Sequence, residues 1–199
     1  MITKVIPYGR SAGAIHREIL KQGIRDRSVQ EAQDWIDLFH ATYRGVSIFL
    51  DDCKRAVTNP GYLVNCFGRY RRFPQTDDRM LIADSEREAL NFPIQSTVGD
   101  AMSVALVNFW NYKRVRRTNP FRLLLSIHDA VLMEVPVANV PEVVERAIPW
   151  CMVRDVEMPG LDLKYGIGDI DIQFRWGEKS DPAMLEAAGV ARDYCGYSK

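Results

Sequence analysis

Two polar side chains, His128 and Asp129, interrupt an apolar segment that runs from Leu123 to Val135. The Leu, Val and Ile residues on both sides of this pair predict a β-hairpin with the two polar residues in its turn. A carboxylate held between two paired strands could bind a metal ion, because a metal site tolerates little positional error. The segment by itself favours an ordinary turn that contains an Asp, so the metal interpretation depends on the rest of the chain.

A second set of polar residues recurs at helical spacing. Arg87, Asn91 and Gln95 lie at positions i, i+4 and i+8 of a predicted helix, and therefore share one of its faces. Such a ladder of hydrogen-bond donors suits the acceptor atoms that every base pair presents in the minor groove of DNA. The spacing alone still favours a solvated polar face over a DNA contact.

The charge of the chain is balanced overall and clustered locally. Lys plus Arg and Asp plus Glu each number 26 among 199 residues, and this balance is mild evidence against a nucleic-acid partner. The basic residues nevertheless form two local clusters: Arg69, Arg71 and Arg72, and then Lys113, Arg114, Arg116 and Arg117. The first cluster fits contacts with phosphates, and a surface loop with solvated arginines fits it nearly as well.

Composition also limits where the protein works. None of the four cysteines belongs to a Cys-x-x-Cys pair, which argues against a zinc site and leaves a reducing compartment as the default. No apolar stretch approaches the ~20 residues that a membrane span needs. The N-terminus lacks the apolar stretch of a signal peptide. We therefore expect a cytoplasmic protein with no membrane partner.

The elements that position these residues are helices and strands without a regular βαβ alternation, which argues for an α+β fold. A capping box at Ser28–Glu31 predicts the start of a helix, which Gly45 should interrupt before the breaker at 59–61. Residues 61–74 are expected to form a short hairpin or an extended loop, with Gly68 in the turn.

A second capping box, Ser85–Glu88, predicts the start of the helix that carries the ladder. Pro93 should kink or interrupt this helix. An apolar stripe follows: Ala101, Met102, Ala105, Leu106, Phe109 and Trp110. Farther on, the pattern predicts a helix over 141–153, half-buried strands over 161–165 and 171–176, and a helical or loose tail.

The ladder and the polar hairpin occur together in one known family. Residues 86–100 resemble the Glu-Arg…Asn-x-Pro-Ile-Gln-Gly-Thr-Ala-Ala-Asp signature of family A DNA polymerases, the DNA polymerase I type. Residues 126–130 resemble the Val-His-Asp-Glu motif of that family, at a similar distance along the chain. Residues 61–74 match its Gly-Tyr-x-x-Thr-x-x-Gly-Arg-Arg-Arg-x-x-Pro segment, and 160–176 resemble its closing strands, which end in a Trp.

The resemblance implies a role for each of these residues. Asp129 would be one of the carboxylates that hold two catalytic Mg²⁺ ions, and His128 would lie against the primer terminus. The ladder residues, Arg87, Asn91 and Gln95, would contact template and primer near the terminal base pair from the minor-groove side. The arginines Arg69, Arg71 and Arg72 would contact phosphates.

The N-terminus resembles the end of the family's nucleotide-binding fingers helix, in one of two registers. In the preferred register, residues 6–10 match a phage-like Ile-Pro-Tyr-Gly-Arg without a gap, and Tyr8 closes over the templating position. Lys4 then replaces an aromatic residue. In the second register, Lys4 and Tyr8 match the family's Lys-x-x-x-Phe/Tyr-Gly, and Ala12 stands where a Tyr is expected.

The chain also departs from the family pattern. Phosphoryl transfer by two metal ions needs several oxygen ligands, and the family takes one essential Asp from a motif upstream of the fingers helix that this chain lacks. Ala130 replaces the second acid of the His-Asp-Glu motif. Asp84 and Asp100 could be named as replacement ligands, although helix capping or solvation is the preferred role for each.

We therefore expect residues 1–74 to form the C-terminal part of the fingers, 75–178 a portion of the palm, and 179–199 a tail. The expected function is that of a C-terminal part of a template-dependent DNA polymerase acting on primer–template DNA and deoxynucleoside triphosphates during replication. A second polypeptide, in the cytoplasm of a bacterial or phage-infected cell, would supply the missing Asp. The alternatives are a non-catalytic primer–template-binding module, a degenerate remnant, or part of a single-subunit RNA polymerase.

Overall fold

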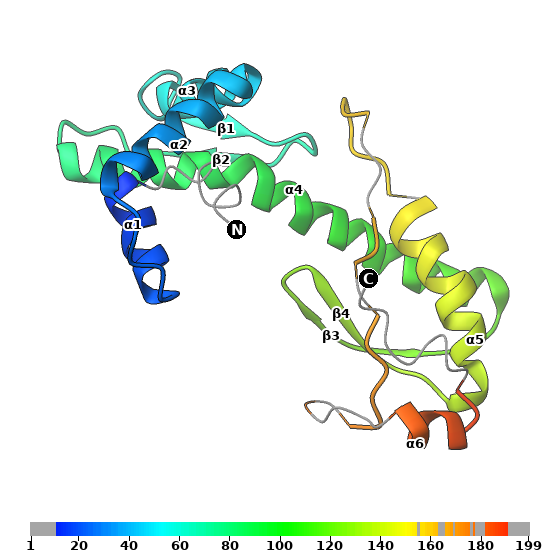
Figure 1. The fold of residues 1–199 in the computed structure, drawn as a ribbon. Coiled ribbons are helices and arrows are strands. Elements are labelled where there is room, and N and C mark those ends of the chain that lie inside the picture. The colour runs from blue at the N-terminus through cyan, green and yellow to red at the C-terminus, as the bar shows by residue number, and fades with distance from the viewer. Residues whose placement is uncertain are drawn as a thin grey trace. The chain divides into compact units, whose positions relative to one another are not determined.

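A computed structural model describes residues 11–154, 156–162, 166–168, 170–175, 177 and 182–190 of the chain (Figure 1). Helices and two small antiparallel hairpins make up these residues, which confirms the expected α+β class. The chain divides into two compact units, Met1–Ser96 and Thr97–Lys199. The expected fingers, palm and tail boundaries remain predictions. The N-terminal motif, with Lys4 and Tyr8, lies outside the described residues.

The first unit begins with two helices, α1 (Ala12–Lys21) and α2 (Val29–Thr42). The predicted capping box of α2 is confirmed, because the Ser28 hydroxyl accepts from the Glu31 N–H at 3.1 Å and the Glu31 carboxylate accepts from the Ser28 N–H at 2.7 Å. The two helices pack through a small apolar cluster: Ala12, Ile15, Ile19 and Ala32, with Trp35, Ile36 and Phe39 at its border.

Helix α3 (Arg44–Thr58) follows after a break at Tyr43, where φ is −107° and ψ is 62°. The expected interruption at Gly45 is therefore wrong by two residues. Gly45 lies in the first turn of α3, where backbone N–H groups need no partner within the helix, so a glycine does not end the helix there. Helix α3 ends at Thr58, before the predicted breaker.

A fourth helix packs on α3 and carries the ladder. The shared core contains side chains from α3, from Phe73 and from α4 (Arg79–Arg116): Leu50, Cys53, Val57, Phe73, Ala89 and Leu90. Between the two helices, β1 (Tyr62–Val64) and β2 (Tyr70–Arg72) form the predicted hairpin. Gly68 lies in its turn with φ of +83°, a conformation that glycine adopts without steric cost.

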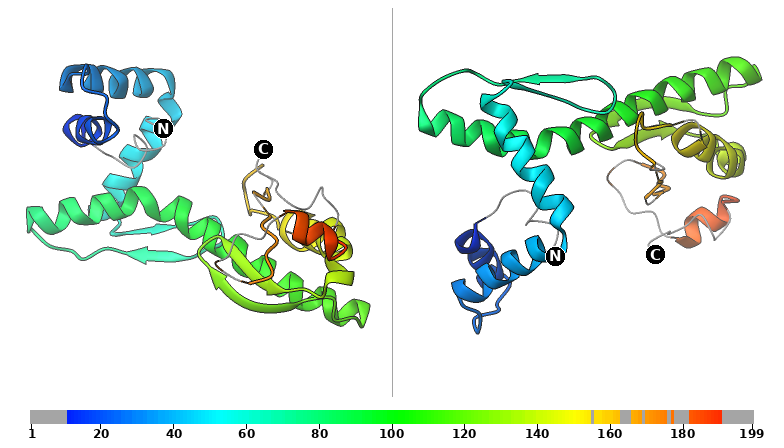
Figure 2. Two further views of the ribbon diagram at one scale, coloured as in Figure 1. Left: turned by 60° about the horizontal axis from the view of Figure 1, so that its bottom comes forward. Right: turned by 90° about the horizontal axis from the view of Figure 1, so that it is seen from above.

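The predicted start of α4 at Ser85 is wrong. The helix begins at Arg79, and the Asp78 carboxylate caps it by accepting from the Met80 N–H at 2.8 Å. Ser85 is buried inside the helix, so it does not act as a cap. Pro93 does not interrupt α4, which is continuous through this position (Figure 2).

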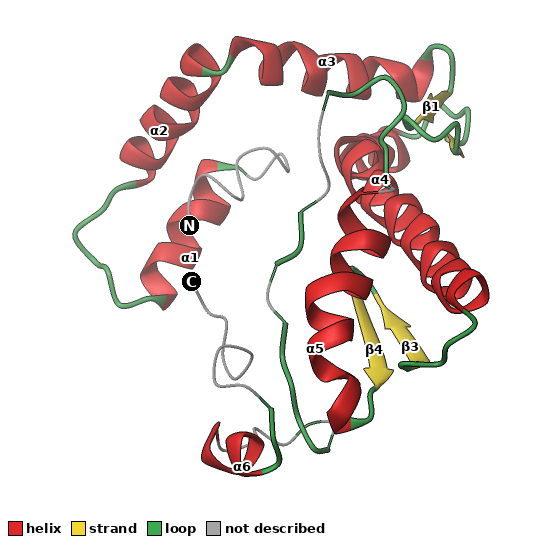
Figure 3. Cartoon of the chain, turned by 90° about the vertical axis from the view of Figure 1, so that its right-hand side faces the viewer, coloured by secondary structure: helices red, strands yellow, loops and turns green. Residues whose placement is uncertain are grey.

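In the second unit, β3 (Arg122–Ile127) and β4 (Ala130–Glu134) form the expected hairpin. A helical stretch follows, and it confirms the predicted helix over 141–153. Its parts are η3 (Val137–Asn139), α5 (Val140–Glu142) and two π-helical segments, η4 (Val143–Ala147) and η5 (Trp150–Arg154). Figure 3 shows α5 beside β3 and β4.

The core of this unit lies between α4, the hairpin and the α5 region, and contains Phe109, Tyr112, Phe121, Val143, Ala147, Ile148 and Cys151. The Tyr112 hydroxyl donates to Glu142 at 3.2 Å, and burial together with this hydrogen bond raises the pKa of Tyr112. The predicted apolar stripe of α4 is confirmed except at Trp110, whose side chain is 65% exposed.

The two strands predicted near the C-terminus are wrong where the structure describes them. Residues 161–162 and 171–175 are not in strands, and the remainder of those segments lies outside the described residues. A strand needs a neighbour to satisfy its backbone groups, and alternation of apolar residues does not supply one. Leu185 of helix α6 (Pro182–Ala187) and Val190, which follows this helix, pack with Val140. No described helix is both long and apolar enough to span a membrane.

Candidate nucleic-acid and metal site

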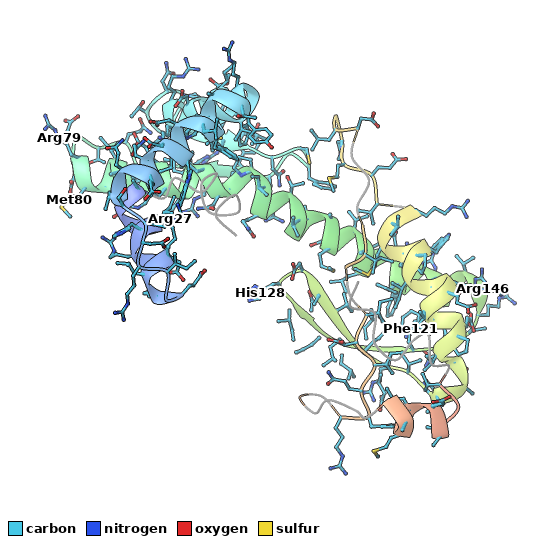
Figure 4. All side chains as sticks on the ribbon, viewed as in Figure 1. Arg27, Arg79, Met80, Phe121, His128 and Arg146 are labelled. Atoms are coloured by element: carbon cyan, nitrogen blue, oxygen red, sulfur yellow. The ribbon has the colours of Figure 1, made fainter. Side chains whose placement is uncertain are left out.

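The predicted polar hairpin tip is present. His128 and Asp129 form the two-residue turn between Ile127 and Ala130, which are paired across the strands. Both turn residues are exposed, and Figure 4 shows His128 pointing away from the tip of the hairpin. The turn therefore presents an imidazole and a carboxylate to the surroundings rather than to the core of its own unit.

The backbone at His128 is in the left-handed region, with φ of 54°, whereas Asp129 does not have a positive φ. A positive φ at the first residue of a two-residue hairpin turn normally favours glycine. For a residue with a side chain it costs about 1–2 kcal/mol. Such local strain recurs at functional sites, so the choice of His at this position calls for a role beyond making the turn.

A β-bulge at Leu124 sets which side chains of the hairpin face the core. Leu123 is opposite Met133, but Leu125 is opposite Leu132, so Leu124 is an extra residue in β3. Leu123 and Met133 pack on the core of the unit. Beyond the bulge, Leu125 and Ile127 fall on the other face, where their side chains are 40% and 36% exposed. The face of the hairpin next to its tip is thus apolar and partly exposed.

Asp129 is the only expected metal ligand at the tip. Within the described ranges, no group of three or more His, Cys, Asp or Glu side chains could hold a metal ion. Asp84 is exposed and pairs with Arg87, whereas Asp100 is 8% exposed and engaged by other residues. The described residues therefore do not form a complete two-metal site, and Asp129 could serve only as one ligand of a shared site.

The ladder residues lie on α4 as the spacing predicts, and two of them have partners there. Arg87 pairs with Asp84, and the Asn91 side chain donates to the Arg87 carbonyl at 3.0 Å. Gln95 is exposed one turn farther along. These hydrogen bonds orient the side chains without burying them, so an incoming acceptor could replace them.

The β1–β2 hairpin separates its arginines. Arg71 pairs with Glu88 of α4, next to the ladder. Arg72 is paired across the strands with Tyr62, whose ring lies 5.4 Å from that of Tyr70 between centroids. Neighbouring residues of a strand point to opposite faces, so Arg71 and Arg72 cannot act as one cluster. The backbone N–H of Arg69 lies in the turn and bonds to Asn65.

Asn65 is a residue that the sequence analysis did not single out. Its side-chain oxygen accepts from the N–H groups of Phe67 and Arg69, and its side-chain nitrogen donates to the Ser96 hydroxyl at 3.0 Å. Asn65 therefore shapes the Gly68–Arg69 turn and attaches it to α4 beside Gln95. The signal was available in the sequence, because Asn is a residue that commonly bonds backbone groups two or more positions ahead.

The candidate residues fall into two groups. The first unit brings the Arg69–Arg72 hairpin and the ladder together through Asn65–Ser96 and Arg71–Glu88. The second unit holds His128 and Asp129. Tyr8, the expected nucleotide-binding residue, lies outside the described residues.

Residues 2–171 match the family described as DNA polymerase family A. The chain is 28% identical over 154 residues to DNA polymerase I A, chloroplastic/mitochondrial, of Arabidopsis thaliana, covering 77% of this chain and 14% of the relative. It is 29% identical over 160 residues to the thermostable DNA polymerase I of Thermus thermophilus, covering 76% of this chain and 18% of the relative.

A solved structure is similar as well. The POL domain of Pol1 from M. smegmatis, in complex with DNA primer-template and dNTP, matches with a TM-score of 0.69 and 26% sequence identity. The match covers 82% of this chain and 27% of that one. The chain thus spans well under a third of each of these three proteins.

Proposed function

We propose a function that starts from one established point: this chain belongs to DNA polymerase family A. In our proposal it is a portion of a template-dependent DNA polymerase and takes part in nucleotidyl transfer during replication, with residues from the end of the fingers and from the palm. The observation that carries the proposal is the exposed His128–Asp129 turn, in which a non-glycine residue is held at a positive φ.

The ladder would hold the primer–template near its end. Arg87, Asn91 and Gln95 carry donors along one side of α4, and minor-groove acceptors are similar in all correct base pairs. Contacts of this kind would sense the geometry of a pair rather than its sequence. Arg72 would contact a phosphate, while the pairing of Arg71 with Glu88 suits it to holding β2 against α4.

Asp129 would contribute one oxygen ligand to a Mg²⁺ site that other residues complete, and His128 would lie against the primer terminus. Mg²⁺ requires nearly octahedral oxygen coordination. Because one exposed carboxylate cannot provide that coordination, a further segment must bring the remaining carboxylates. Tyr8 would close over the templating position when a deoxynucleoside triphosphate binds.

The hairpin itself supports the need for a further segment. A two-stranded hairpin is marginal by itself, and Leu125 and Ile127 are partly exposed on the face away from the core. An extended, apolar segment of another polypeptide could add to this hairpin as a strand and cover that face. In our proposal the same polypeptide carries the Asp that the family takes from upstream of the fingers helix. We therefore include a second polypeptide among the proposed partners, in the cytoplasm of a bacterial or phage-infected cell.

The test is primer extension by the 199-residue chain alone and by this chain mixed with a polypeptide that carries the family's segments upstream of the fingers helix. We expect extension only in the mixture, and its loss with Asp129→Asn. Asp171→Asn is the matched control, because Asp171 is an exposed Asp of the same unit. Strong extension by the chain alone would contradict the need for a partner, and full activity of Asp129→Asn would remove this residue from catalysis.

A non-catalytic primer–template-binding module is the second candidate. It is favoured by the single carboxylate at the hairpin tip, since the described part of the chain holds no group of three or more His, Cys, Asp or Glu side chains that could bind a metal ion. In that case the Asp129→Asn variant and the unaltered chain, each mixed with the second polypeptide, would bind primer–template equally tightly. The two mixtures would also extend the primer at the same rate. No observation favours a fragment of a single-subunit RNA polymerase, and selective incorporation of ribonucleotides would be needed to reinstate it.

A further inference from the structure

The C-terminal half of α4 exposes an aromatic side chain near cations in the sequence. Trp110 is 65% exposed and Val107 is 58% exposed. Val107, Trp110 and Arg114 are spaced i, i+3 and i+7, so they share one helix face. We call these three residues, together with Arg117 just beyond the helix, the Trp110 face.

The sequence around this face is basic. Residues 101–128 contain five Lys or Arg residues and no Asp or Glu, in a chain whose net charge is zero. Lys113 lies over the Phe121 ring, 5.4 Å from its centroid, and Arg116 lies over the Tyr112 ring at 4.9 Å. These two cations are therefore directed toward the core of the unit.

Arg114 and Arg117 are exposed, and neither has an ion-pair partner among the described residues. Cations in the last turn of a helix also complement the helix dipole. That effect accounts for the charge but not for a Trp left in water on the same face. Aromatic rings interleaved with cations are the arrangement by which proteins hold single-stranded nucleic acid, with bases on the rings and phosphates on the cations.

We propose that the Trp110 face binds single-stranded nucleic acid, with a base stacked on the Trp110 indole and neighbouring phosphates on Arg114 and Arg117. This surface goes beyond the proposed polymerase site, because none of its residues belongs to the ladder, the Arg69–Arg72 hairpin or the hairpin tip. A single strand suits it better than a duplex, since stacking needs an unpaired base with a free face.

The test is binding of the full chain to an oligothymidylate of about 16 nucleotides, without Mg²⁺ or nucleotides, followed by tryptophan fluorescence and by anisotropy of an end label. We expect the oligonucleotide to quench a part of the fluorescence that is missing in Trp110→Phe. Trp110→Leu should weaken binding by about fivefold or more, whereas Trp110→Phe should retain most of the affinity, because Leu is apolar but cannot stack. Circular dichroism checks that each variant is folded.

The salt dependence tests the cations separately. The logarithm of affinity falls with the logarithm of salt concentration, and each phosphate contact with a single strand makes this slope steeper by about 0.7. The double variant Arg114→Gln with Arg117→Gln should therefore make the slope shallower by about 1.4. The matched control is Arg25→Gln with Lys54→Gln, which removes two exposed cations from the other unit. The control pair should leave the slope nearly unchanged.

Two outcomes would overturn the inference. One is equal affinity of Trp110→Leu and the unaltered chain, which would fit an apolar docking surface for a protein. Another is tighter binding to phosphatidylglycerol vesicles than to the oligonucleotide. The two proposals can fail separately. Binding through Trp110 without any primer extension by the mixture would support the single-strand site and contradict the proposed polymerase function.

Discussion

Asn65 and Ser96 are joined by a hydrogen bond of 3.0 Å between the side-chain nitrogen of Asn65 and the hydroxyl of Ser96, across 31 residues of sequence. The Ser96 hydroxyl in turn donates to the Phe92 carbonyl at 2.6 Å. Both residues depart from the family pattern, which has Thr where Asn65 stands and Gly where Ser96 stands. The two departures thus contact each other, and together they attach the Gly68–Arg69 turn to the helix that carries Gln95.

This contact predicts a coupling between the two positions. Asn65→Thr and Ser96→Gly should each lower the free energy of unfolding by about 1 kcal/mol, because each breaks a partly buried hydrogen bond. The double variant should lose less than the sum, with a coupling of about 0.5–1.5 kcal/mol. Chemical denaturation of the four proteins measures it. The control is the double variant Ser96→Gly with Ser103→Gly, whose two losses of unfolding free energy should simply add. If the losses of Asn65→Thr and Ser96→Gly also add strictly, the contact between Asn65 and Ser96 contributes nothing to stability.

The positive φ of His128 predicts that stability and activity oppose each other at this position. His128→Gly should raise the free energy of unfolding by about 1 kcal/mol, because glycine adopts this conformation without steric cost. The same substitution should slow primer extension by the chain mixed with its partner. Asp129→Gly is the control, and it should not stabilise the protein, since Asp129 has no positive φ. A lower free energy of unfolding in His128→Gly than in the unaltered chain would show that the positive φ at His128 does not cost stability.

The capping box of α2 predicts a loss of stability in acid. The Ser28 backbone N–H, and then the Arg27 side chain, lower the pKa of Glu31 from its ordinary 4.5. Glu31 therefore contributes stability above pH 4.5 that is lost as the pH falls through its lowered pKa. Ser28→Ala should cost about 1 kcal/mol at neutral pH. The melting temperature, measured at a series of acid pH values, should fall less steeply with falling pH in Glu31→Gln than in the unaltered chain. Ser85→Ala changes a serine that caps no helix, and it should leave this fall unchanged.

Cys53 predicts a loss of stability in alkali. Burial, and then the charge of Asp52, raises the pKa of the Cys53 thiol from 9.0 to about 11. A raised pKa means that its stabilisation is complete below pH 9.0 and is lost as the pH rises through about 11, because the unfolded chain releases the proton first. Cys53→Ala should flatten the decline of the unfolding free energy in this range. Cys66→Ala should retain the decline, and an identical decline in both variants would exclude Cys53 as its source.

Local sequence determined the features whose partners are close in the chain. The Ser28–Glu31 capping box, the Gly68 turn and the two-residue turn at His128–Asp129 all depend on backbone and side-chain groups within a few residues. Helical spacing likewise placed Arg87, Asn91 and Gln95 on one face, because the period of a helix is a property of the backbone. The family motifs at 61–74, 86–100 and 126–130 lie on the Gly68 turn, the ladder helix and the His128–Asp129 turn.

Tertiary structure decided the features that need a partner from elsewhere. Ala89 and Leu90 of α4 pack on α3, and Ser85 is buried within the helix instead of starting it. The bulge at Leu124 decides which hairpin side chains reach the core, and the packing of Phe109 and Tyr112 directs Trp110 into water. Burial free energy depends on which surfaces meet, and alternation or spacing along one segment does not specify the surface that covers it.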